Sequence, residues 1–201
     1  KDKKVPLSTF ALGLTLPDAS GIHGPLIGKG SFVVPNNVGY DQETGQSPKP
    51  VAFWTVGVNG AEVEVNTDTG EIRVLKMISC FDPGKVINPA LYDAQVEGAM
   101  VQALGTALFE ELMLKDGRIL NRNFVDYKIP TADDMPELTV RVAEHEEPTG
   151  PYGARGIGEP VMVPGAPAIA NAVANAIGCR FFRMPIRADD VLKALKEKKA
   201  Q

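Results

Sequence analysis

Two β-rich stretches joined by a short turn place the strongest limit on the fold of this chain. Residues 53–65 and 71–81 are rich in β-branched and aromatic side chains, and the residues between them end in Gly70, which can adopt a positive φ. This pattern predicts a strand, a turn and a second strand. Apolar and acidic residues alternate strictly over residues 61–65, so one face of the first strand is expected to be exposed to solvent.

A long helix is expected directly after this hairpin. Asn88 and Pro89 form a typical helix start, with Asn88 as the N-cap and Pro89 at the first helical position. Apolar residues then recur at three- and four-residue steps, which predicts a helix over residues 89–114 with one apolar face. Asp116 and Gly117 are expected to end it.

Two shorter helices are predicted nearer the C-terminus. Residues 166–177 are nearly all Ala, Ile, Val and Asn, so we expect this helix to be buried on most sides. Residues 189–199 are amphipathic, with their lysines on a solvated face. Because hairpins and helices are mixed instead of alternating regularly, the sequence favours an α+β architecture over a doubly wound sheet.

The density of glycine and proline suggests where the chain divides. Residues 1–50 have short apolar runs between Gly and Pro residues, which is typical of a loop-rich segment that packs on the rest of the chain or on a partner. Residues 51–201 contain the predicted strands and helices and are expected to form the α+β domain.

Charge and hydropathy exclude several classes of function. The 21 basic and 25 acidic residues give a net charge of −4, so the chain lacks the basic surplus that nucleic-acid binding needs. Its apolar stretches are shorter than the roughly 20 residues that cross a bilayer, so no membrane partner is expected. The charged first four residues lead into no signal core, which makes the cytoplasm the default location.

Side chains that bind metals are few and isolated. Cys80 and Cys179 are far apart with no CxxC pattern, and neither His23 nor His145 stands at metal-ligand spacing. The chain is therefore not expected to hold an iron–sulfur cluster by itself. We expect both cysteines to be small buried apolar side chains and both histidines to lie at the surface or in turns.

The most unusual segment is residues 150–160, where four glycines surround Glu159. Such a density marks tight turns or a close approach of the backbone to a ligand. One interpretation is a surface loop with an exposed glutamate. The other is that the apolar run at residues 161–164 carries Glu159 towards the interior, where a carboxylate with a disfavoured ionised form can act as a general base near neutral pH.

The predicted helix start is a second candidate site. A helix N-terminus offers unpaired N–H groups and a positive dipole end, which suit the phosphate or carbonyl oxygens of a cofactor. Gln95 and Gln102 are seven residues apart and hence lie on one helical face. Each is either a ligand contact or a polar residue at the edge of the packing.

Four segments occur in an order that matches a known family. They are residues 82–105 with DPGKVINP, QVEG and QALG, residues 126–131 with DYKIPT, residues 153–160 with GARGIGEP, and residues 166–172 with APAIANA. Together they resemble the C-terminal part of the molybdopterin-binding subunit of the molybdenum hydroxylases. This family includes xanthine dehydrogenase, aldehyde oxidoreductase and the large chain of carbon monoxide dehydrogenase. The resemblance implies the C-terminal portion of a molybdopterin-binding domain, with mixed sheet hairpins and packed helices.

The resemblance also implies roles for individual residues. Glu159 matches the base that takes a proton from a hydroxyl on molybdenum. Gln95 matches a contact to the pterin or to an oxygen ligand of molybdenum, and Ala90 lies where the family's backbone approaches the active centre. Gly156 and Gly158 would let the chain bend so that Glu159 points at the metal. No residue of this chain is expected to ligate the metal itself.

The implied cofactor is molybdenum–molybdopterin in its cytosine dinucleotide form, shared with missing segments or another chain. FAD and 2Fe–2S clusters would lie on partner subunits, so the expected partners are the remainder of the molybdopterin subunit, the iron–sulfur and flavin subunits, and a small-molecule substrate. The chain would then be one component of a molybdenum-dependent oxidoreductase, inactive alone. The alternative is a non-catalytic assembly module that keeps the fold, although a purely structural role would not require the Glu159 carboxylate.

Two residues depart from the family's pattern. Ala94 and Ala103 stand where the family usually has glycine. Each adds a methyl group near the long helix, which is expected to narrow the approach of the cofactor without removing a polar contact.

Overall fold

The computed structural model describes residues 8, 11, 13–15, 18, 20–22, 25, 27–35 and 37–200. The chain divides into two compact units, Lys1–Val33 and Val34–Gln201. In the first unit, β1 (Leu14–Thr15) and β2 (Gly21–Ile22) form a short antiparallel pair. The expectations for His23 and for the first four residues fall outside the described residues.

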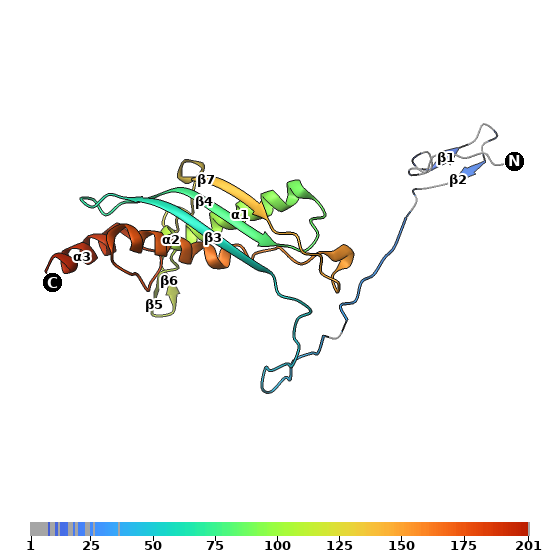
Figure 1. Ribbon diagram of the computed structural model, residues 1–201, viewed down its shortest axis with the longest axis horizontal. Coiled ribbons are helices and arrows are strands. Elements are labelled where there is room, and N and C mark those ends of the chain that lie inside the picture. Colours follow the sequence, from blue (N-terminus) through green and yellow to red (C-terminus); the bar gives the residue numbers. More distant parts are fainter. Residues whose placement is uncertain are drawn as a thin grey trace. The chain divides into compact units, whose positions relative to one another are not determined.

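A three-stranded sheet forms the centre of the second unit (Figure 1). β3 (Val56–Val65) pairs antiparallel with β4 (Ile72–Asp82), and Gly70 in the turn between them has a φ of 78°. The predicted hairpin is therefore confirmed, although β3 begins three residues later than the β-rich run. On the other side of β4 lies β7 (Glu137–Val142), which runs parallel to it and which the sequence pattern did not predict.

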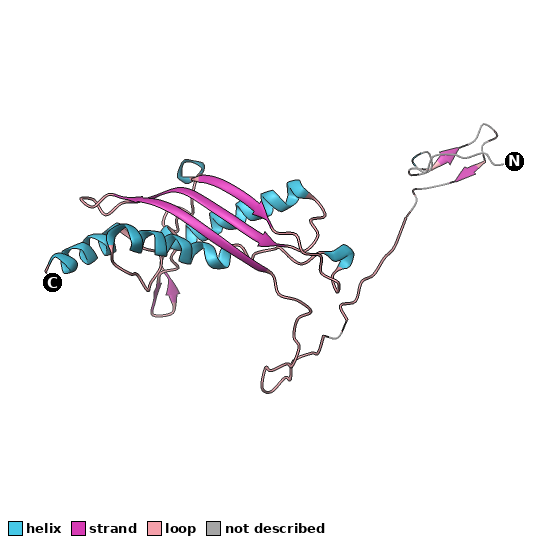
Figure 2. Ribbon diagram, in the orientation of Figure 1, coloured by secondary structure: helices cyan, strands magenta, loops and turns pink. Residues whose placement is uncertain are grey.

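Two helices, α1 (Pro89–Leu108) and α2 (Met162–Ile177), pack against one face of this sheet (Figure 2). Asn88 caps α1 as predicted, because its side-chain oxygen accepts a hydrogen bond from the amide of Leu91 at 3.2 Å. The apolar stripe of α1 meets the sheet and α2 in the main core, whose fully buried members include Met77, Val96, Met100, Ala103 and Ile169. The predicted α+β architecture is confirmed.

The first long helix is shorter than the sequence pattern indicated. It ends at Leu108, not at residue 114. Asp116 and Gly117 do not terminate it but form the turn between β5 (Leu114–Lys115) and β6 (Arg118–Ile119), with φ values of 51° and 75°. An Asp-Gly pair strongly favours a two-residue hairpin turn, because both positions need a positive φ. The predicted helix was too long because apolar residues continue at similar spacing past the end of α1 and into this hairpin.

The second helix begins at Met162, four residues before its predicted start, and only one side of it is buried. The buried residues are Gly165, Ala166, Ile169, Val173 and Ile177, which follow helical spacing. Asn171 and Asn175 on the other side are exposed. The expectation of burial on most sides was wrong, because the side of the helix that carries the asparagines is exposed in this chain.

Gly165 allows α1 and α2 to approach closely. A Cβ atom at this position would overlap the Cβ of Ala103, and it would lie 3.0 Å from the Nδ2 of Asn59. The methyl group of Ala103 is therefore turned towards α2 and fully buried. The expectation that it narrows the approach of a ligand was wrong, because this face of α1 points into the core.

The last helix, α3 (Ala188–Lys199), confirms the predicted amphipathic segment, with Val191 buried in a second apolar cluster. One of its lysines does more than face solvent: the ammonium group of Lys198 donates to the carbonyl of Ile177 at 2.9 Å, at the C-terminal end of α2. Cys80 and Cys179 are free and only partly buried. In the described part of the chain, no helix is long and apolar enough to span a bilayer.

Candidate functional site

The glycine-rich loop lies beside the turn that follows β4. Gly84 and Ala154 form an isolated antiparallel bridge, and the amide of Arg155 donates to the carbonyl of Pro83 at 2.6 Å. Gly84 has a φ of 66°, and a side chain there would overlap the carbonyl of Gly153, so this position requires glycine. Two of the motifs identified in the sequence are thereby joined by main-chain contacts.

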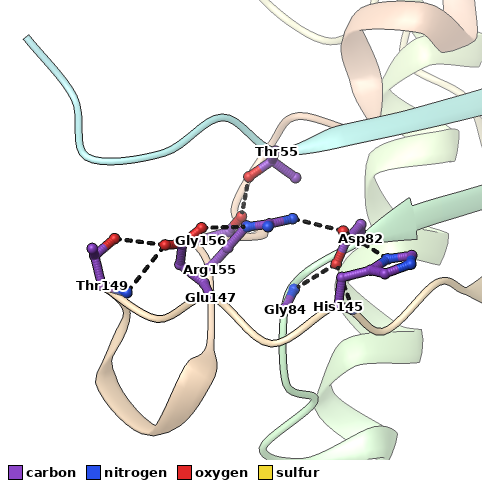
Figure 3. Close-up of polar contacts among 8 residues, drawn as sticks. All are labelled: Thr55, Asp82, Gly84, His145, Glu147, Thr149, Arg155 and Gly156. Atoms are coloured by element: carbon purple, nitrogen blue, oxygen red, sulfur yellow. Dashed lines mark hydrogen bonds and ion pairs between the residues drawn. The ribbon is translucent and has the colours of Figure 1, made fainter. Parts of the chain in front are cut away.

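Arg155 connects this loop to two carboxylates (Figure 3). Its Nη1 lies 2.6 Å from Oδ2 of Asp82, and its Nε lies 3.2 Å from Oε2 of Glu147. The side chains of Arg155, Asp82 and Glu147 are only 15, 14 and 13% exposed, so all three are largely shielded from solvent. Charge-assisted hydrogen bonds of this kind are stronger than neutral ones, and the guanidinium fork fixes their direction.

The environment of Asp82 favours its ionised form. Burial alone would raise the pKa of this carboxyl, but the amides of Gly84 and His145 donate to its Oδ1 at 2.9 and 3.2 Å, and Arg155 contacts its Oδ2. Together these donors hold the pKa of Asp82 below its ordinary value. Nδ1 of His145 also lies 3.2 Å from Oδ2.

Glu147 is stabilised in the same way from the other side of Arg155. The hydroxyl and the amide of Thr149 donate to its Oε1 at 2.6 and 3.1 Å, which lowers the pKa of Glu147, and Arg155 lowers it further. The hydrogen bonds that Arg155 donates to Asp82 and Glu147 correspondingly raise the pKa of Arg155. All three groups are therefore charged at neutral pH.

Residues 154–158, here called the strap, are held at two further points by other elements. The hydroxyl of Thr55 donates to the carbonyl of Gly156 at 2.9 Å, and Nε2 of Gln95 donates to the carbonyl of Gly158 at 2.5 Å. Between these two points, Ile157 packs against the main core. The strap therefore follows one fixed path between the start of β3 and α1.

A pocket of about 430 Å³ lies between the strap and the start of α1. Its lining is mostly apolar with a few convergent polar groups, which is typical of sites for small molecules and cofactors. Apolar side chains of Val86, Ile87, Leu91 and Ile157 line it, and its polar or charged lining residues are Lys85, Asn88, Gln95 and Arg155. Gln95 and Gly158, predicted as cofactor contacts, are thus brought together at this pocket.

Glu159 directly follows the strap, and its side chain is exposed in this chain. Of the two interpretations of this segment, the structure of this chain agrees with the exposed glutamate and not with the one in which the next residues carry it into the interior. Val161 is the residue that is fully buried there, whereas the carbonyl of Glu159 accepts a hydrogen bond from the amide of Met162 at 3.2 Å in the turn that starts α2. The carboxylate therefore faces outward.

The predicted glycines and Ala90 are accessible. Gly156 and Gly158 are exposed, adopt no positive φ, and would have no atom within 4 Å of an added Cβ. Glycine is thus not required at either position by the backbone of this chain. Ala90 is exposed in the first turn of α1, where amide groups have no partner within the helix.

The polar groups of the pocket come from a small number of its lining residues. Among the described residues, no cluster of three or more His, Cys, Asp or Glu side chains offers a site for a metal ion. The lining of the pocket includes the side chain of Gln95, whose Nε2 donates to the strap, and two residues of the first turn of α1, Leu91 and Tyr92, whose amides are bonded to Asn88.

Sequence reasoning missed the three residues that hold the strap to the sheet. Asp82 and Arg155 both stand within recognised motifs, DPGKVINP and GARGIGEP, so the motifs themselves carried a signal for them. Glu147 lies outside every motif, and nothing in the local sequence marks it.

Comparison with known proteins identifies the chain's family. Residues 4–136 match the family model described as a molybdopterin cofactor-binding domain. The chain belongs to this family. The matched residues of this molybdopterin cofactor-binding domain include the end of β4 and all of α1, whereas the strap and Glu159 follow them.

The relatives of this domain are much longer proteins. It is 36% identical over 139 residues to the xanthine dehydrogenase molybdenum-binding subunit of Escherichia coli O157:H7, covering 68% of this chain and 18% of that protein. It also superimposes on aldehyde oxidoreductase from Desulfovibrio gigas with a TM-score of 0.64 and 36% identity, covering 71% of this chain and 15% of that one. The superposition on quinoline 2-oxidoreductase from Pseudomonas putida 86 has a TM-score of 0.64 and 30% identity, and it covers 67% of this chain and 18% of that one. The chain thus spans less than a fifth of the length of these proteins and belongs to a family of molybdenum-binding oxidoreductases.

We expect the contacts of Arg155 with Asp82 and Glu147 to weaken below about pH 4. The pKa of each carboxyl is lowered in the folded chain, so each contributes stability that is fully present above its unfolded pKa and is lost as the pH falls through its folded pKa. Urea denaturation of the purified protein from neutral pH to about pH 3 measures this loss. The variant Asp82→Asn should have a lower free energy of unfolding than the wild type at neutral pH, and this free energy should fall less on acidification. If it fell with pH as it does in the wild type, the assignment would be contradicted.

Proposed function

We propose that this chain forms part of the molybdenum-binding subunit of a hydroxylase or dehydrogenase, to which it contributes a general base, Glu159, and part of the cofactor site. The observation that carries the proposal is the pocket at the start of α1. Its wall includes Gln95 and Gly158, which are hydrogen-bonded to each other, and Glu159 is the next residue along the chain.

Two of the proposed cofactor contacts, Gln95 and Gly158, line this pocket, and the other two, Ala90 and Gly156, are next to lining residues in the chain. Gln95 would contact the cofactor through its side-chain oxygen, and the backbone at Ala90 would approach it at the N-terminal end of α1, where the helix dipole favours phosphate or carbonyl oxygens. Gly156 and Gly158 would leave room for a close approach, because neither has a side chain and the space beside each is open. A bound molybdenum–molybdopterin group, proposed in its cytosine dinucleotide form, would supply the redox and oxygen-transfer chemistry.

Glu159 would accept a proton during oxidation of the substrate. A carboxylate serves as a base only if it is ionised and placed within hydrogen-bond reach of the proton that it removes. The strap fixes the backbone immediately before Glu159, and the side chain is exposed in this chain, so it is free to face a cofactor that other residues help to hold.

The remaining parts of the enzyme would come from elsewhere. We propose that the rest of the molybdopterin subunit completes the site, and that iron–sulfur and flavin subunits with 2Fe–2S clusters and FAD pass electrons onward. The substrate would be a small molecule, such as an aldehyde, an N-heterocycle or carbon monoxide. Large exposed apolar side chains, including Trp54, Val56 and Val58 at 77, 66 and 63% exposure, support a partner that covers this end of β3.

The alternative function is a non-catalytic assembly module with the same fold. The same exposed apolar side chains favour it, because they mark an interaction surface whether or not the site is active. The two functions differ in what they predict for Glu159, since an assembly module has no activity that depends on this carboxylate.

Metal analysis tests whether the pocket is one part of a divided cofactor site. The chain purified alone is expected to contain much less than stoichiometric molybdenum and pterin, because it presents only one wall of the site. When it is purified with the rest of the molybdenum-binding subunit, both should approach one per complex. Stoichiometric molybdenum in the chain alone would contradict a divided site, and a complex that never contains molybdenum would favour the assembly module.

A further inference from the structure

We propose that Arg155 is a positioning residue that fixes the strap, and thereby the place of Glu159, through its contacts with Asp82 and Glu147. The inference rests on the proposed function, since it takes the Glu159 carboxylate as the group to be placed. It adds a role for three residues to which the proposed function gives none.

The strap needs external anchors because its own sequence is flexible. Gly156 and Gly158 lack a Cβ atom, and nothing packs on the place where one would stand, so steric contacts do not restrict their backbone. The strap amides that bond to main-chain carbonyls are those of Ala154 and Arg155, at its beginning. Further along the strap, the carbonyls of Gly156 and Gly158 are bonded to the side chains of Thr55 and Gln95.

Arg155 is the anchor that joins the strap to the rigid part of the domain. Asp82 is the last residue of β4, the central strand of the sheet, and Glu147 lies in the segment between β7 and the strap. Because the planar guanidinium offers donors in a fixed fork, contacts at 2.6 and 3.2 Å from Nη1 and Nε define both the position and the orientation of the group. A lysine at this position has one ammonium centre and cannot reproduce both directions.

Asp82 is itself held in place. Its Oδ1 accepts the amides of Gly84 and His145, so the carboxylate cannot turn away from Arg155 without breaking these bonds. Thr55 and Gln95 then fix the carbonyls of Gly156 and Gly158 further along the strap. The three anchors follow one another along the strap and end at the residue before Glu159.

Hydrogen exchange measured by mass spectrometry tests the anchor directly. In the full protein, Arg155→Met keeps the length of the side chain and removes the donors, so amides in the peptides that cover residues 83–86 and 153–158 should exchange at least about tenfold faster. Peptides from β3 and from the C-terminal half of α1 should keep their wild-type rates. The matched control is Arg141→Met on β7, which makes the same charge change at an exposed side chain whose Nη1 donates to the adjacent carbonyl of Val140.

Two milder variants keep the test decisive if Arg155→Met folds poorly. Arg155→Lys retains the charge and should restore part of the protection in the strap but not all of it. Thr55→Val keeps the shape of the side chain and removes the donor to the carbonyl of Gly156. It should speed exchange in the strap peptide and leave peptides elsewhere unchanged. Gln95 is unsuitable for this purpose because the proposed function also gives it a cofactor contact.

Kinetics of the assembled, molybdenum-loaded enzyme provide the second measurement. A misplaced Glu159 should lower kcat by about tenfold or more at unchanged molybdenum content, with a much smaller change in KM, because a loss of about 1 Å in placement costs mainly the chemical step. Arg155→Lys should recover part of kcat. The Arg141→Met control should match the wild type in both constants.

The inference is overturned if Arg155→Met leaves exchange in the strap at the wild-type rate. It is also overturned if exchange rises equally in all peptides, which would show a general loss of stability. These outcomes are separate from a failure of the proposed function. If Glu159→Gln were fully active while Arg155→Met loosened the strap, the anchor would stand and the role of Glu159 as a base would fall.

Discussion

Replacement of Glu159 by glutamine in the assembled enzyme is expected to lower turnover by about 10² to 10⁴-fold, with cofactor content near the wild-type value. Glutamine keeps nearly the same shape but cannot accept a proton. The strap should remain in place, because its anchors are Arg155, Thr55 and Gln95 and none of them contacts the Glu159 side chain. The expected loss is therefore one of kcat at full molybdenum occupancy.

The measurement is steady-state turnover normalised to molybdenum content. Glu146→Gln is a suitable control because it makes the same charge change at an exposed glutamate. That side chain makes no hydrogen bond or ion pair within the described residues. It should keep near wild-type activity. If Glu159→Gln retained more than about a tenth of wild-type turnover at full occupancy, the proposed base would have to be abandoned.

Local signals in the sequence predicted most of the elements around the site. The Asn88-Pro89 pair placed the start of α1 correctly, because an N-cap side chain and a residue without an N–H both suit the first helical turn. The β3–β4 hairpin was equally well marked, since a short turn with a glycine leaves few alternatives. In both cases the determining interactions lie within a few residues of one another.

Elements fixed by distant contacts were not predicted. The parallel strand β7 pairs with β4 but follows it in the chain only after α1 and a long connection. Nothing in the short run of residues 137–142 indicates which strand it pairs with. Likewise, Arg155 and Asp82 are 73 residues apart in the chain, so their ion pair follows from the tertiary fold. The family resemblance singled out Gln95 and Gly158 separately, but only the structure shows that they are hydrogen-bonded to each other.

The exposure of Glu159 illustrates a limit of reasoning from apolar runs. In one of the two interpretations of this segment the apolar residues after Glu159 draw it inward, but they lead into α2, where successive side chains point in different directions around the helix axis. Val161 is buried and Val163 is exposed, so an apolar neighbour does not determine the direction of a side chain two residues away.

Substitution of Gly165 by alanine is expected to lower the free energy of unfolding by about 2 kcal/mol, although alanine is the better helix former. The gain in helix propensity is about 1 kcal/mol. Overpacking of a tight core costs about 1 to 3 kcal/mol, and the upper part of that range applies here. The new Cβ would overlap the Cβ of Ala103, which is fixed to the backbone of α1 and cannot rotate away. The helices would have to separate, and the hydrogen bond from Nδ2 of Asn59 to the carbonyl of Val161 would be strained.

A double-mutant cycle isolates this contact from the effect of helix propensity. Ala103→Gly alone should destabilise the domain by about 1 kcal/mol or somewhat more, because it places glycine in a helix interior and removes a buried methyl group. In the double variant the methyl group has moved from α1 to α2, so stability measured by urea denaturation should return to within about 1 kcal/mol of the wild type. The sum of the two single effects is about 3 kcal/mol, and the shortfall from that sum measures the clash. Additive effects would show that α1 and α2 are not in close contact at this point. The packing of α2, which begins shortly after Glu159, against α1 would then need to be revised.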